Sequence, residues 1–127
     1  MSFSNYLETK ILDHVFGGTA YTAPGTLYLA LFTAVSSGET GSVTEVSGTA
    51  YTRKSVAFTT SGDTTSNTAA VEFDTAGSNW GTVTHVGIYD ASSAGNLMAY
   101  AALSSSKTIE SGDVFRVPAG DLDITLN

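Results

Sequence analysis

Hydrophobic and polar residues alternate at every second position in one short segment after another, from residue 26 almost to the C-terminus. The clearest case is GDLDITL at 120–126, where the leucines and the isoleucine share one face. A period of two is that of a β-strand. Predicted strands lie at 26–33, 50–58, 69–73, 82–90, 96–103, 113–117 and 120–126.

The segments between these strands are rich in glycine, serine, asparagine and aspartate, as in TTSGDTTSN at 59–67 and TAGSNWG at 75–81. Such composition is typical of turns. Strands that arrive roughly every ten residues with turns between them predict an antiparallel β-sandwich. The pattern does not distinguish a jelly roll from an immunoglobulin-like arrangement.

The strand TLYLALFT at 26–33 is apolar on both faces, with Leu27, Leu29 and Leu31 on one and Tyr28, Ala30 and Phe32 on the other. A strand of this kind is expected at the centre of a sheet and covered on both sides. In 82–90, Val83, His85, Gly87 and Tyr89 are expected to share one face, with Val86 and Ile88 on the other.

One amphipathic helix is predicted at about 4–16, before the strands begin. Phe3, Leu7, Ile11 and Val15 recur at helical spacing, and Gly17-Gly18 ends the pattern. A helix of about three turns is marginal in water by itself, so its apolar face is expected to pack on the sheet. Residues 1–127 are therefore predicted to form one domain, a helix followed by a β-sandwich over 26–126.

The chain has 127 residues, no cysteine and a net charge of −7. Its length permits a hydrophobic core without disulfides. The negative charge opposes binding to phosphate backbones, so no direct nucleic-acid partner is expected. No segment predicts a membrane span or a cleaved secretory signal, and synthesis in a host cytoplasm is expected.

Candidate catalytic groups are few. His85 and Asp90 bracket an apolar run, but the only other histidine, His14, lies in the predicted helix. No metal-binding motif, no serine nucleophile motif and no paired carboxylates occur. We therefore predict no enzyme activity, no catalytic, cofactor-binding or metal-binding residues, and no small-molecule substrate.

Two features indicate a protein interface. SSGETGSVTEVSG at 36–48 reads as a long exposed loop with perhaps one short strand inside it. Trp80 lies beside two glycines in the predicted turn at 75–81, where it either anchors a partner or caps the core.

Several strings resemble a family of small bacteriophage virion proteins. They are LETKILDHVFGGTAYTAPGTLYLALFTA at 7–34, TEVSGTAYTRKSVAF at 44–58, and the segment from WGTVTHVGIYDA to the C-terminus at 80–127. Members of this kind are often labelled tail fibre proteins, and they also resemble capsid cement or decoration proteins. The resemblance implies a non-enzymatic structural component of the virion.

The absence of heptads and repeats favours a cement protein that stabilises the capsid from outside, as a homotrimer bound to the major capsid protein. The alternatives are a tail fibre or tail-tip component bound to tail proteins, and a module that binds host-surface glycans through Tyr51, Trp80 and Tyr100. The predicted protein interface consists of Phe3, Tyr6, Ser37, Gly38, Glu39, Thr40, Gly41, Ser42 and Trp80.

Overall fold

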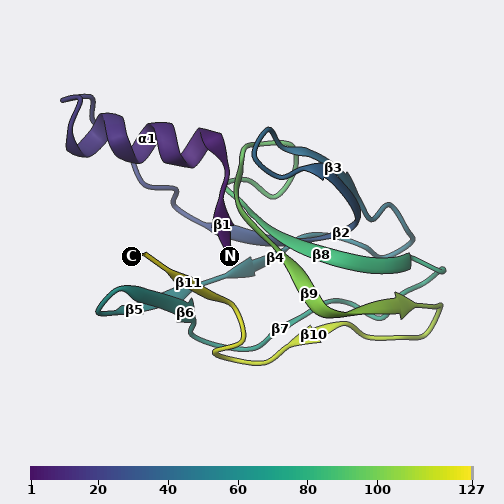
Figure 1. The fold of residues 1–127 in the computed structure, drawn as a ribbon. Helices are drawn as coiled ribbons and strands as arrows, with labels where there is room; N and C mark the ends of the chain where they lie inside the picture. Colours follow the sequence, from purple (N-terminus) through teal and green to yellow (C-terminus); the bar gives the residue numbers. More distant parts are fainter. Residues whose placement is uncertain (127) are drawn as a thin grey trace.

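The computed structural model describes residues 1–126, which form two β-layers and one projecting helix (Figure 1). The larger layer has six strands: β1 (Ser2–Phe3), β2 (Leu27–Ser37), β3 (Ser42–Glu45), β4 (Lys54–Val56), β8 (Gly81–Tyr89) and β9 (Leu97–Ile109). Their order is β1-β9-β8-β2-β3, with β4 also paired to β2, and every pairing is antiparallel.

The second layer consists of two small sheets. One contains β5 (Phe58–Ser61), β6 (Thr64–Asn67) and β11 (Asp123–Thr125), and the other pairs β7 (Val71–Glu72) with β10 (Arg116–Val117). The main hydrophobic core joins leucine, isoleucine and valine side chains of the large sheet to Phe73, Phe115 and Leu122 of the other layer. The mainly β class and the β-sandwich predicted from the sequence are confirmed.

Strand β2 is central, as its two apolar faces predict. Residues Leu29 to Phe32 have no exposed surface. Leu29 and Leu31 belong to the main core, whereas Ala30 and Phe32 form a second cluster with Tyr89 and Leu97 on the opposite face. Phe32 and Tyr89 meet edge to face, with ring centres 6.1 Å apart.

In strand β8, one residue lies on the opposite face of the sheet from the face predicted. The register with β9 shifts between Val83 and His85, so that Val83 lies in the main core with Val86 and Ile88 instead of sharing a face with Tyr89. A β-bulge of this kind adds one residue and reverses the alternation beyond it.

The helix α1 (Asn5–Val15) begins close to the prediction but is not packed on the sheet. None of its residues is buried, and Leu12, Val15 and the C-cap Phe16 are 58%, 60% and 81% exposed. Figure 1 shows α1 attached to the sheet at its first turn and projecting away from both layers. The expectation that its apolar face covers the sheet is wrong for the single chain.

Two segments predicted as loops are β-hairpins. Residues 36–48 hold the end of β2, a turn at 38–41 and β3, with Ser37 paired to Ser42. Residues 59–67 hold most of the β5–β6 hairpin. Threonine and serine make up most of the β5–β6 strands, so the apolar alternation that predicts strands is absent there.

Candidate functional site

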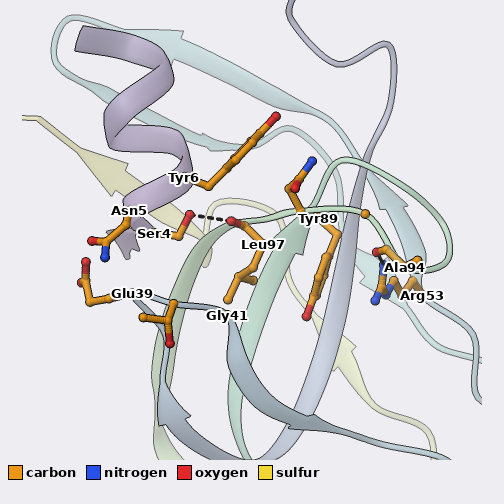
Figure 2. Close-up of a pocket in the computed structure, with 12 residues that line it drawn as sticks. Ser4, Asn5, Tyr6, Glu39, Gly41, Arg53, Tyr89, Ala94 and Leu97 are labelled. Carbon is orange, nitrogen blue, oxygen red and sulfur yellow. Dashed lines mark hydrogen bonds between the residues drawn. The ribbon is translucent and has the colours of Figure 1, made fainter. Parts of the chain in front are cut away.

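The predicted interface residues fall into one cluster and one outlier. Tyr6 of α1 and Glu39, Thr40 and Gly41 of the β2–β3 turn line a common groove of about 530 Å³. The remaining lining residues are Ser4, Asn5, Arg53, Tyr89, Ala94, Gly95, Asn96 and Leu97. Figure 2 shows Asn5 and Glu39 on one side of this groove and Tyr89 and Arg53 on the other.

The start of α1 is fixed to strand β9 by Ser4, which is 2% exposed. Its backbone N–H donates to the carbonyl of Met98 at 2.9 Å, and its hydroxyl donates to the carbonyl of Leu97 at 2.5 Å. The same hydroxyl oxygen accepts from the N–H of Leu7, which makes Ser4 the N-cap. Phe3, just before it, is half-buried in β1 against the main core.

The β2–β3 turn is held by Tyr100 and by the helix. Glu39 accepts a hydrogen bond from the Tyr100 hydroxyl at 2.5 Å, and its backbone carbonyl accepts from the N–H of Asn5 at 3.0 Å. Gly38 is covered by the Tyr100 ring so closely that a Cβ atom would overlap it. The centre of the predicted exposed loop is therefore a turn that contacts the start of α1.

Arg53 lies on the opposite side of the groove and makes several hydrogen bonds there. Its side chain is 8% exposed and donates to both carboxylate oxygens of Glu45 at 2.9 Å. It also donates to the carbonyls of Ala91 and Ala94 at 2.9 and 2.7 Å. Burial raises the pKa of the Tyr89 hydroxyl, although the charge of Arg53 acts in the opposite direction.

The loop between β8 and β9 is fixed by Asp90. One carboxylate oxygen accepts from the backbone N–H of Asn96 at 2.7 Å, and the other accepts from its side-chain amide at 2.9 Å. Ala94 and Gly95 have positive φ angles of 54° and 77°, which close the loop tightly. Arg53, Tyr89 and Asn96 were not identified as groove residues from the sequence. Asp90 and the turn that follows it were a local sign of the β8–β9 loop.

Trp80 is the outlier and corrects the interface prediction. It is 5% exposed, its indole N–H donates to the carbonyl of Thr49 at 3.0 Å, and its ring meets Tyr51 edge to face. It therefore closes one end of the core and offers little surface to a partner.

The predicted aromatic glycan surface does not form either. Tyr51 stacks on the buried Phe73, and its hydroxyl donates to Glu45 at 2.6 Å. Tyr100 lies over Gly38 at another place in the fold. The set of Tyr51, Trp80 and Tyr100 is thus divided between the core and the β2–β3 turn.

The two histidines have separate local roles. The Nδ1 atom of His85 lies 2.8 Å from the Thr84 hydroxyl, and His85 pairs with Phe32 and Ala102 inside the sheet. His14 accepts a hydrogen bond from the backbone N–H of Tyr21 at 3.0 Å. Among residues 1–126, no three histidine, aspartate or glutamate side chains gather to hold a metal ion.

None of the helices in the described part of the chain has the length and apolar character needed to cross a bilayer.

Comparison with curated proteins gives no match. The family model described as Podophage GP4 fiber I protein gp80 matches residues 2–125, almost the full chain. The chain therefore belongs to this family of bacteriophage fibre-type structural proteins.

Proposed function

We propose that this protein is a structural component of a fibre on a bacteriophage particle and acts through protein–protein contacts without catalysis. The family description supports the fibre assignment. The observation in the structure that carries the proposal is the projecting helix α1, whose apolar side chains are exposed in the single chain.

Leu12, Val15 and Phe16 follow one another at helical spacing and lie on one side of α1 near its free end. Soluble domains rarely expose several large apolar side chains together unless a partner covers them. Burial of such side chains is worth about 25 cal/mol per Å² of apolar surface. The exposed apolar side chains of α1 therefore lower the stability of the isolated domain only slightly. Their burial against a partner would stabilise an assembly.

The partners that we propose are further copies of this chain and the fibre or tail proteins next to it. Copies in a closed ring are related by rotational symmetry, so the same helix face is repeated around an axis. A homotrimer is one such arrangement. The acidic net charge of −7 leaves nucleic acid an unfavourable partner.

The test is incorporation of variants into phage particles. The double variant Val15→Ser, Phe16→Ser removes apolar surface from α1, whereas Val114→Ser makes a matched change at a residue that is 46% exposed and outside the helix. Both variants should unfold in urea within about 0.5 kcal/mol of the unchanged protein, because exposed positions contribute little to the core.

We expect the double variant to be absent or strongly depleted in purified particles, as measured by quantitative mass spectrometry. The Val114→Ser protein should be incorporated normally. Full incorporation of the double variant, with its fold intact, would show that α1 is not the contact surface.

A capsid cement protein is the second candidate. Its supporting observation is the compact sandwich, in which residues 1–126 form no extended shaft (Figure 1). In that case the same helix would contact the major capsid protein on the outer surface of the shell. The two functions differ in the number of copies per particle, because a cement protein covers the shell and a fibre protein does not.

A further inference from the structure

A cleft of about 560 Å³ lies between strand β9 and the strands β10 and β11 of the smaller layer. It shares no lining residue with the groove beside α1, and we call it the β9–β10 cleft. Buried apolar side chains line it, because Phe115, Val117 and Leu122 are each 8% exposed or less. Leu103 and Pro118 add apolar surface that is more exposed. The cleft therefore offers an apolar surface to a partner.

The edge of β9 beside this cleft is open. One edge of β9 pairs with β8, whereas the other pairs with β1 only at Ala99 and Tyr100. Within residues 1–126, no strand pairs with that second edge over 101–109, and β10 pairs only with β7. Covering by a helix is one way in which native proteins protect an open edge. A helix in the β9–β10 cleft would cover this edge and the apolar surface together.

The helix α1 has a matching apolar face and no partner for it. Leu12, Val15 and Phe16 are exposed and stand at positions i, i+3 and i+4, the spacing with which an amphipathic helix enters an apolar groove. In its own chain, α1 contributes no lining residue to the β9–β10 cleft. Its free end projects away from both layers (Figure 1). The helix of a second copy is therefore the occupant that the chain itself supplies.

The charge at one side of the cleft suits the acidic border of α1. Lys107 and Arg116 line the cleft. Within residues 1–126, Lys107 forms no ion pair, and Arg116 has only a contact of 3.9 Å with Glu72. On α1, the exposed Asp13 stands three residues before Phe16 and therefore borders the apolar face. A second copy that places Asp13 beside Lys107 pairs an exposed acid with an unpaired cation.

The other side of the cleft carries the opposite sign. Asp121 lines the cleft from the segment before β11, whereas Lys107 comes from β9. On α1, Lys10 follows Leu7 by three residues and borders the apolar face on the side away from Asp13. Copies with a net charge of −7 repel one another in general. Complementary charges on both borders favour this contact over other contacts between copies.

We propose that the β9–β10 cleft of one copy receives α1 of a second copy, with Leu12, Val15 and Phe16 on the apolar lining and Asp13 beside Lys107. The inference rests on the proposed function, because it names the partner of the same helix face. The helix and the cleft are different surfaces, so the contact is head-to-tail. Repeated around an axis, such a contact closes into a ring in which each copy gives one helix and receives one.

The test exchanges the two charges. Lys107→Glu and Asp13→Lys should each lower the number of copies in purified phage particles about tenfold, because like charges then meet in the contact. The combined variant Asp13→Lys, Lys107→Glu should restore incorporation, because every contact again pairs opposite charges. Quantitative mass spectrometry measures the copies, after urea unfolding has shown that each variant keeps its fold.

The matched control is Asp63→Lys combined with Lys107→Glu, which has the same net charge as the exchanged variant. Asp63 lies in the turn between β5 and β6, outside both α1 and the cleft. This control should remain as depleted as Lys107→Glu alone. The proposal is overturned if Asp13→Lys does not restore incorporation, or if Asp63→Lys restores it equally well.

A cross-link tests the head-to-tail arrangement. The chain has no cysteine, so Val15→Cys, Ser105→Cys introduces one thiol on α1 and one beside the cleft. Treatment of purified particles with a bismaleimide should join three or more chains in series. Products no larger than a dimer would contradict a head-to-tail contact.

The inference and the proposed function fail in different ways. If Val15→Ser, Phe16→Ser is depleted from particles while Lys107→Glu is incorporated fully, α1 contacts another protein. The proposed function then stands and the docking in the β9–β10 cleft is refuted. If Val15→Ser, Phe16→Ser is itself incorporated fully, α1 is not the contact surface and both proposals fail.

Discussion

The guanidinium carbon of Arg53 lies 3.6 Å from the centre of the Tyr89 ring. The same side chain forms a bidentate pair with Glu45 and donates to the carbonyls of Ala91 and Ala94. One buried cation therefore joins the end of β3, the end of β8 and the β8–β9 loop. A stacked and bidentate arginine cannot be replaced by lysine without loss of contacts.

Arg53→Ala should lower the free energy of unfolding by roughly 3 kcal/mol, because it leaves the half-buried Glu45 carboxylate without its cation. Urea unfolding followed by tryptophan fluorescence measures the change. Lys54→Ala is the control, since its ion-pair partner Asp74, at 2.9 Å, has a side chain that is 62% exposed. It should cost less than about 1 kcal/mol. Equal losses in the two variants would refute the role given to Arg53.

Gly87→Ala tests the packing of the second hydrophobic cluster. A Cβ atom at Gly87 would lie 2.5 Å from the Phe32 ring and 2.8 Å from Leu97. Overpacking of this kind should destabilise the fold by about 1–3 kcal/mol. Gly25→Ala places a methyl group in open space at an ordinary φ angle and should change stability little. Thermal unfolding of both variants decides the point, and a neutral Gly87→Ala would contradict the close packing.

The stability of the protein should fall as the pH rises above about 10, the ordinary pKa of tyrosine. Burial, and next the hydrogen bond to Glu45, raise the pKa of the Tyr51 hydroxyl above that value. A raised pKa in the folded state means that the unfolded chain loses this proton first. The stability contribution is therefore complete below pH 10 and is lost as the pH increases.

Tyr51→Phe removes this ionisable group and should make the fall shallower, by at most about 1.4 kcal/mol per pH unit. The measurement is the free energy of unfolding in urea between about pH 8 and pH 11. Tyr89 and Tyr100, whose pKa values are also raised, remain in both proteins. Identical slopes for the two proteins would contradict the assigned role of Tyr51.

The sequence predicts those elements whose side chains alternate between a core face and another face. Strand β2 is recognisable because Leu29 and Leu31 enter one core while Ala30 and Phe32 enter the other. The β5–β6 hairpin is not, because its threonines pair with one another through hydroxyl groups, as Thr60 and Thr65 do at 3.0 Å. Strands of this kind do not have apolar residues at every second position.

Two further differences depend on contacts between distant segments. The bulge at Val83 arises from pairing with β9 and leaves no sign in the local alternation. Trp80 is buried because Gly48 and Tyr51, some thirty residues earlier in the chain, lie against its ring. The groove likewise requires α1, Arg53 and the β8–β9 loop to meet, which periodicity alone does not predict.

The most direct test of the fibre assignment is the number of copies of this chain in purified phage particles, measured by quantitative mass spectrometry against the major capsid protein. A fibre component should be present in a small number of copies, set by the symmetry of the appendage. A copy number of the same order as that of the major capsid protein would contradict the fibre assignment and establish a cement protein on the shell.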